Sequence, residues 1–201
     1  MFGEAVAAKD LKRYRRKGPL KTTRILLGAL RAEGVRGATL LDIGGGVGAI
    51  SNALLDAGAT RATVVDASPA YLQAAKTEAE RQGHRDRITY RYGDFVEVAP
   101  EVPSADVVTL DRVICCYDDM EALVSTSAER AERLYGVVYP RDTWWDRIGV
   151  SLVNFACRAR RSPFRVFVHS PAAVERVIRD KGLTRRFYRT TAIWQVAVFA
   201  R

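Results

Sequence analysis

Leu40-Leu41-Asp42-Ile43-Gly44-Gly45-Gly46-Val47-Gly48-Ala49-Ile50 runs from an apolar segment through an acid into four glycines. The pattern predicts a strand, a tight turn and the start of an amphipathic helix. Glycine has no Cβ and adopts positive φ without strain, so a ligand can lie directly against the backbone of such a turn. The turn also points the N–H groups of the helix N-terminus towards that ligand. We therefore expect a loop that binds a small, hydrogen-bonding ligand.

Two more acids follow predicted strands further along the chain. One strand ends at Asp66, where a carboxylate can accept hydrogen bonds from both hydroxyls of a ribose. Another ends in Gly93-Asp94-Phe95, where an acid can accept a hydrogen bond from the exocyclic amine of adenine. The plain alternative is that Asp66 and Asp94 only cap the helices that follow, since Asp is a good N-cap.

In this order and spacing, the three motifs resemble those of class I S-adenosylmethionine (SAM)-dependent methyltransferases, over roughly residues 38–140. The resemblance implies SAM as the cofactor and an α/β, Rossmann-like fold. Its sheet would have seven mostly parallel strands, one antiparallel strand, and helices on both faces. The implied cofactor-binding residues are Asp42, Gly44, Gly45, Gly46, Gly48, Asp66, Ala67, Gly93, Asp94, Phe95 and Asp111.

The glycine pattern taken alone also fits a dinucleotide site, because Gly44-x-Gly46-x-x-Ala49 matches the Rossmann fingerprint. An NAD-dependent oxidoreductase is therefore an alternative. Asp42 before the glycines, Gly93-Asp94-Phe95 after the third strand and the lack of a separate substrate domain argue against it.

Apolar periodicity along the chain predicts strands alternating with helices, and so a largely parallel sheet. The predicted strands cover about 38–43, 61–66, 87–93, 106–111 and 133–139, with a hairpin over 184–201. The predicted helices cover about 19–34, 47–57, 69–83, 118–130, 144–160 and 171–181, with a polar loop at 96–104. We expect one domain, in which residues 1–37 form a basic lid and helix and residues 38–201 form the SAM-binding part.

The net charge of +9 is unevenly distributed along the chain. Basic residues outnumber acidic ones by ten to three in residues 1–37 and by thirteen to four in 141–201, whereas acids lead by sixteen to nine in 38–140. Basic flanks around an acidic core predict an anionic acceptor. The plain alternative is that the arginine-rich composition of the chain only reflects a high-GC genome. A nucleic-acid-binding protein with a methyltransferase-like core is a third interpretation, but no basic stripe is interleaved with aromatic residues, so we expect nucleic acid to be an unlikely partner.

The acceptor-facing segment should follow the fourth strand, at Asp111–Asp119. It lacks the Asn-Pro-Pro-Tyr motif of amine methyltransferases. Together with residues 133–201 it resembles the magnesium-protoporphyrin IX O-methyltransferases, in which a short apolar run after this strand ends in His-Tyr. Here the run ends in Cys116-Tyr117, so the histidine that the family implicates in catalysis is replaced. The resemblance implies a small acidic or aromatic acceptor, with O-methylation of a carboxylate as one case.

Three residues are catalytic candidates: Tyr14, Tyr117 and His169. Each has a plain alternative in packing or in a structural hydrogen bond. Trp144 and Trp145 are candidates for stacking on a flat ligand, and Arg112 and Arg165 for pairing with an acidic substrate. His84 lies in a polar turn and is given no role. Cys115 and Cys116 are interpreted as packing residues.

Composition excludes several other classes of protein. Three cysteines form neither a disulfide framework nor a zinc spacing, so we expect no metal and a reducing, cytoplasmic setting. No apolar run is long enough for a membrane span, and no secretory signal is evident. We expect a monomer or a homodimer. Six of the nine residues 9–17 are basic, so we expect this segment to be mobile without ligand. Residues 11–18 also resemble the Arg-aromatic-Arg segment of the magnesium-protoporphyrin IX O-methyltransferases, which implies that the segment closes over the cofactor with Tyr14 near the mouth of the site. A permanently docked helix is the alternative.

Overall fold

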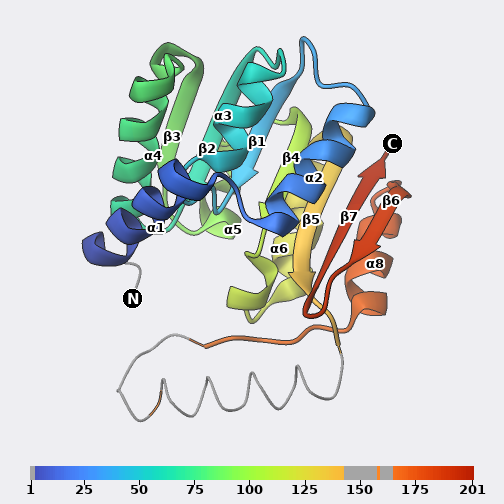
Figure 1. Cartoon of the computed structure of the whole chain (residues 1–201). Helices are drawn as coiled ribbons and strands as arrows, with labels where there is room; N and C mark the ends of the chain where they lie inside the picture. Colours follow the sequence, from blue (N-terminus) through green and yellow to red (C-terminus); the bar gives the residue numbers. More distant parts are fainter. Residues whose placement is uncertain (1–2, 143–157, 159–164) are drawn as a thin grey trace.

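A twisted seven-stranded sheet forms the centre of the molecule in the computed structural model, which describes residues 3–142, 158 and 165–201 (Figure 1). The strand order is β3-β2-β1-β4-β5-β7-β6, and β7 runs antiparallel to both of its neighbours while the other pairs are parallel. The strands are β1 (Thr39–Ile43), β2 (Arg61–Asp66), β3 (Ile88–Tyr92), β4 (Ala105–Asp111), β5 (Ala131–Pro140), β6 (Thr184–Thr190) and β7 (Trp194–Ala200). The predicted fold class is confirmed.

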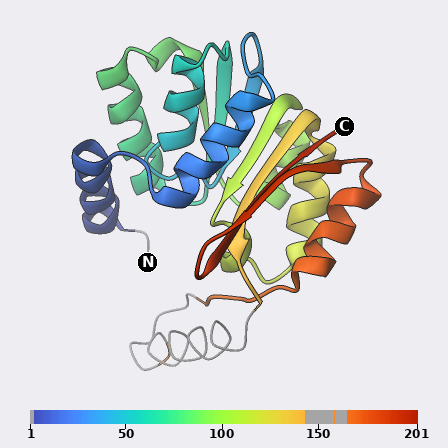
Figure 2. The ribbon, with the colours of Figure 1, turned by 45° about the vertical axis from the view of Figure 1, so that its right-hand side comes forward.

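Helices cover both faces of the sheet (Figure 2). The α-helices are α1 (Glu4–Lys17), α2 (Lys21–Ala32), α3 (Ala49–Asp56), α4 (Pro69–Gln82), α5 (Phe95–Val98), α6 (Met120–Glu129) and α8 (Pro171–Asp180), and the short 3-10 turns are η1 (Arg85–Arg87), η2 (Ala99–Glu101) and η3 (Ile114–Cys116). The predicted helix at 144–160, with Trp144 and Trp145, lies outside the described residues. None of the helices described has the length and apolar character needed to cross a membrane.

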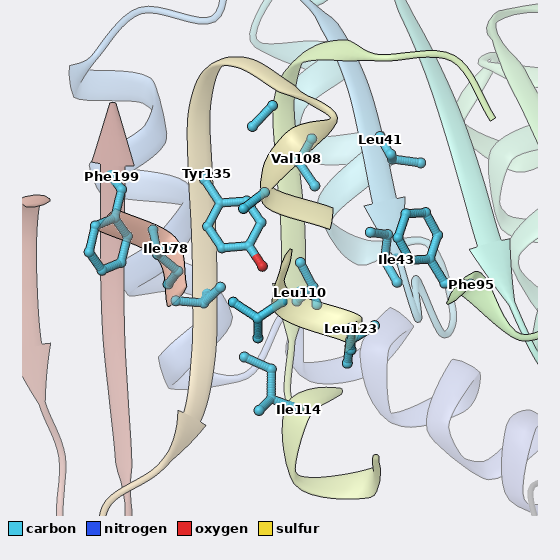
Figure 3. Packing of buried hydrophobic residues seen from close by; sticks show 14 of the residues in the cluster. Leu41, Ile43, Phe95, Val108, Leu110, Ile114, Leu123, Tyr135, Ile178 and Phe199 are labelled. Atoms are coloured by element: carbon cyan, nitrogen blue, oxygen red, sulfur yellow. The ribbon is translucent and has the colours of Figure 1, made fainter. Parts of the chain in front are cut away.

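Two apolar cores lie on opposite faces of the sheet. One joins the strands to α5, α6 and α8, and Figure 3 shows Phe95, Leu123 and Ile178 from these helices together with Tyr135 of β5. The other joins the strands to α2, α3 and α4. The two cores explain why β1, β4 and β5 read as continuous apolar runs, since both of their faces are buried.

Two local predictions were wrong. The segment predicted as a loop at 96–104 contains α5 and η2, because the Asp94 carboxylate accepts a hydrogen bond from the Val96 N–H at 2.9 Å and starts a helical turn. The predicted helix start at Pro19 was also wrong, since α2 begins at Lys21 with Leu20 as its N-cap.

The basic segment 9–17 is part of α1, which is docked against α4. Leu11 and Tyr14 pack with buried Ala7 in a small cluster that includes residues of α4. The Arg15 Nε donates to Glu78 Oε2 at 2.7 Å, and Glu78 is fully buried. Burial alone would raise the pKa of Glu78, but hydrogen bonds from Arg81, Arg15 and Gln82 lower it to about 2. An ionised glutamate therefore joins the two helices.

Candidate active site

A cavity of about 690 Å³ lies at the carboxyl ends of the parallel strands, where open α/β sheets bind their ligands. It brings together nearly all the residues predicted to bind the cofactor. The lining includes Asp42, Gly44, Gly45, Gly46, Asp66, Ala67, Gly93, Asp94, Phe95 and Asp111. Gly48 does not line it; this residue is the N-cap of α3.

The glycine turn needs its glycines for two different reasons. Gly44 has φ of +64° and lies so close to Val113 that any Cβ would collide with that side chain. Gly46 has φ of +54°, and a Cβ there would meet nothing within 4 Å. The backbone at Gly46 therefore borders open space, as a turn that receives a ligand should.

Asp42 is a buried acid with one unsatisfied oxygen. Its Oδ1 accepts a hydrogen bond from the Thr109 hydroxyl at 2.7 Å, while Oδ2 has no partner among the residues described. Burial, reinforced by repulsion from Asp111 and Asp66, raises the pKa of Asp42 to about 7. A buried oxygen without a donor is costly, so this atom fits a ligand that brings an N–H or a positive charge.

Asp66 is held in a fixed orientation by two backbone donors. Its Oδ2 accepts from the Gly46 N–H at 3.0 Å and its Oδ1 from the Ser68 N–H at 2.8 Å. Burial raises the pKa of Asp66, and these hydrogen bonds oppose the rise. Each carboxylate oxygen has about two acceptor sites, so both can still accept a hydroxyl of a ribose.

Asp94 caps a helix and also lines the cavity. Its Oδ1 accepts from the Val96 N–H at 2.9 Å, which caps α5, and from the Tyr117 hydroxyl at 2.9 Å. Burial, the hydrogen bond to Asp94 and the nearby acids raise the pKa of Tyr117 above its usual range. The phenol therefore stays protonated and holds Asp94, which does not suit it to act as a base.

The other two catalytic candidates do not line the cavity. The Tyr14 side chain packs between α1 and α4, and its hydroxyl accepts a hydrogen bond from Gln82 at 3.5 Å. The His169 Nε2 lies 2.8 Å from the Tyr117 carbonyl, to which it donates, and its ring stacks on Phe167. The structure gives each residue a supporting contact instead of a place at the cavity.

Several lining residues were missed because they lie outside the motifs. From the N-terminal part these are Asp10, Arg13, Pro19, Leu20 and Thr23, and from the rest of the chain Tyr71, Val166 and Trp194. The Tyr71 hydroxyl donates to Asp10 at 2.6 Å, which joins α4 to α1 at the cavity. Arg165 does not line the cavity, although its neighbour Val166 does. Among the residues described, no group of three His, Cys, Asp or Glu side chains could hold a metal.

Arg112 has an unusual backbone. Its φ of +64° is the one positive value at a non-glycine position in the described part of the chain. The Arg112 N–H donates to the Val138 carbonyl at 2.8 Å, and its Nε donates to Asp111 Oδ1 at 3.1 Å. Such strain persists only where surrounding contacts hold it, and it is common at functional sites. It places Arg112 in the cavity wall, with its guanidinium paired to Asp111.

The fold and this cavity resemble those of class I SAM-dependent methyltransferases. Residues 40–133 match the model of a family described as a methyltransferase domain. The ribosomal protein L11 methyltransferase of Alteromonas mediterranea is 33% identical over 123 residues, which cover 58% of this chain and 42% of that relative. The chain thus spans less than half of the length of this relative.

Solved structures agree on the fold. Magnesium protoporphyrin IX methyltransferase from Synechocystis PCC 6803, with bound SAH, matches with a TM-score of 0.74 at 20% identity over 97% of this chain and 95% of that one. A candidate RNA methyltransferase from Pyrococcus horikoshii matches with a TM-score of 0.63 at 12% identity, over 92% and 84% of the two chains. These similarities favour SAM as the cofactor over the NAD of the alternative.

Proposed function

We propose that this chain transfers a methyl group from SAM to a small acidic acceptor, with the carboxylate oxygen of an aromatic acid as the leading case. The observation that carries the proposal is the mixed lining of one cavity. Besides five acids, the lining contains Arg13, Arg112 and Trp194. Two guanidinium groups suit an anion, and an indole suits a flat ring.

The acids and the glycine turn would hold the cofactor. Asp66 would accept from the ribose hydroxyls, Asp94 from the adenine amine, and Asp42 would face the positive part of the ligand. When bound, SAM supplies a methyl group on a positively charged sulfur. The residues of the chain position the two reactants and keep water away, which accounts for most of what a methyl transfer requires.

The absence of a histidine from the described cavity lining favours a carboxylate acceptor. The chain has two histidines, and neither His84 nor His169 lines the cavity as described. The Tyr117 hydroxyl donates a hydrogen bond to Asp94 and keeps its proton, so it is not available as a base. A carboxylate is already ionised at neutral pH and needs no proton removed, whereas an alcohol or a phenol does.

An acceptor panel tests the proposal. Methyl-labelled SAM is incubated with the protein and with aromatic acids or with their amides, and transfer is measured. We expect transfer to the acids only, and we expect Arg112→Met to raise KM for the acid while Arg112→Lys retains part of the affinity. Arg24→Met, at an exposed position on α2, is the matched control. Transfer to amides as readily as to acids would refute the proposal.

A macromolecular acceptor is the second candidate, and it is favoured by the basic flanks. The relative from Alteromonas is named for a ribosomal protein, and one structural neighbour is described as acting on RNA. The expectation that nucleic acid is an unlikely partner therefore has no support. Adding total RNA or ribosomal protein to the same assay distinguishes the two classes. Three expectations stay predictions: that the protein is cytoplasmic, that it is a monomer or a homodimer, and that residues 1–37 form a lid and helix apart from the SAM-binding part at 38–201.

A further inference from the structure

Two adjacent thiols meet at the wall of the cavity. Cys115 and Cys116 belong to η3, directly after β4, and both line the cavity. Their sulfur atoms lie 3.8 Å apart, and both thiols point to the Arg112 carbonyl at 3.5 and 3.8 Å. Neither is in a disulfide. The side chains therefore point the same way, although they are neighbours in the sequence.

The two thiols differ in exposure and in acidity. Cys115 is buried and Cys116 is exposed. The hydrogen bond from Cys115 lowers the pKa of Cys116, burial opposes this, and the charge of Arg112 lowers the pKa further. The same hydrogen bond, together with burial, raises the pKa of Cys115. Thiolates are the reactive form of cysteine, so Cys116 is the more reactive of the two.

Packing explains Cys115 but does not explain Cys116. A buried cysteine acts as a small apolar side chain, as predicted from the sequence. An exposed thiol with a lowered pKa beside a second thiol is instead the arrangement of a peroxide-sensitive pair, in which one sulfur is oxidised and the other resolves it. Because both cysteines line the cavity, their oxidation state can affect a ligand that binds there.

We propose that Cys116 is an oxidative modification site, and that Cys115 is its resolving thiol. The Cys116 thiolate attacks one oxygen of a hydroperoxide, the O–O bond breaks, and the other oxygen leaves as hydroxide or alkoxide and takes up a proton. This step gives a sulfenic acid at Cys116. The Cys115 sulfur then attacks the Cys116 sulfur, the S–O bond breaks, and the hydroxide leaves as water with the thiol proton. The two sulfurs lose two electrons, which the peroxide gains.

Closing this disulfide must move the cavity wall. The sulfurs have to approach from 3.8 Å to about 2.05 Å, the length of an S–S bond. The η3 turn continues into Tyr117, whose hydroxyl holds Asp94 and whose carbonyl accepts from His169. The Cys115 carbonyl also accepts from the Phe167 N–H at 2.8 Å. Oxidation is therefore expected to disturb a cofactor-binding acid and to lower cofactor affinity.

The experiment uses the full chain with Cys157→Ser, so that the pair contains the only thiols. The reduced protein is treated with hydrogen peroxide and analysed by intact mass, peptide mapping and calorimetry with SAH. We expect a loss of two hydrogens mapped to the peptide with both cysteines, and an increase of about tenfold in Kd for SAH, equivalent to about 1.4 kcal/mol. Thiol reductant should restore both values.

Two variants separate the roles of the thiols. Cys115→Ser should accumulate a sulfenic acid at Cys116 that dimedone traps. Cys116→Ser should show the same SAH affinity before and after peroxide. A pair that stays reduced at peroxide doses that oxidise free cysteine overturns the proposal, as does overoxidation of Cys116 while Cys115 is present. A disulfide that leaves the Kd for SAH unchanged overturns the link to the cavity. None of these readouts depends on the methyl acceptor, so failure here is distinct from failure of the proposed function.

Discussion

Replacing Asp42 with Asn is expected to stabilise the fold and to weaken cofactor binding at the same time. Asp42 is buried, and its Oδ2 has no donor among the described residues. Its pKa is raised from 3.8 to about 7, chiefly by burial. An ionised carboxyl at pH 8 therefore destabilises the folded state by roughly 4 kcal/mol. Asn is neutral, has the same shape and still accepts the Thr109 hydrogen bond.

The pH dependence follows from the direction of this shift. The folded pKa lies above the unfolded one, so the wild type loses stability as the pH rises from about 4 to about 7. The variant lacks this loss. Its Tm should exceed that of the wild type by on the order of 10 °C at pH 8, and the difference should fade towards pH 4. Thermal unfolding at several pH values measures both.

Binding should change in the opposite direction. SAM carries positive charge and favours the ionised carboxyl, so the affinity of the wild type should fall by up to about tenfold per pH unit below pH 7. Asp42→Asn should bind SAM more weakly at pH 8 and should lack this slope. Thr109→Val removes the hydroxyl that donates to Asp42 and lowers its pKa, so the variant should lose stability and gain SAM affinity over a higher range of pH than the wild type. A variant no more stable than the wild type at pH 8, or equal slopes in the two proteins, refutes the reasoning.

Three other predictions concern the rest of the cavity. Asp66→Ala should raise the Kd for SAH at least about tenfold in calorimetry, because hydrogen bonds to charged groups contribute roughly 1.5–3 kcal/mol each. Asp86→Ala, at an exposed turn, is the control and should leave the Kd unchanged. Equal affinities of the two variants would contradict the ribose role of Asp66. The rate of methyl transfer to an acidic acceptor should fall as the salt concentration rises, because the screening length shortens from about 10 Å at 0.1 M to about 3 Å at 1 M. A rate that does not depend on salt would contradict steering by the basic flanks. Residues 9–17 should exchange amide hydrogens more slowly with SAH than without it. They should exchange faster in the Glu78→Gln variant than in the wild type, because the variant lacks the ionised partner of Arg15. Strong protection in every state would show that this helix is permanently docked and is not a lid.

The strands were the most predictable part of the fold. Residues 61–66 were predicted with the observed limits, and the other strands lie within about two residues of them, because apolar runs between turn residues leave little choice. The helix α1 was harder to foresee. Its sequence is basic and polar, and it docks through distant residues of α4 such as Glu78, which is more than 60 positions from Arg15. Local pattern carries no information about such a partner.

The residues of the site also differ in how far the sequence predicts them. Acids next to glycines were found because each motif is local, while Trp194 and Asp10 reach the cavity only through tertiary packing. His84 was set aside as a turn residue, yet it is buried, and its Nδ1 lies 2.9 Å from Asn52 Oδ1. Asn52 in turn donates to the Gly48 carbonyl at 2.8 Å. Burial is what distinguishes this histidine, and a polar turn gives no sign of it.

The cavity draws its two kinds of lining from different parts of the chain. The acids and glycines that suit a nucleoside come from the ends of β1, β2 and β3, while the arginines and Trp194 come from α1, the segment after β4 and the start of β7. Arg13 and Arg112 belong to neither apolar core, so substitutions there can alter the charge of the cavity without disturbing the packing of the sheet. The architecture therefore makes acceptor choice separable from cofactor use, and so open to rapid divergence among related chains that keep the same methyl donor.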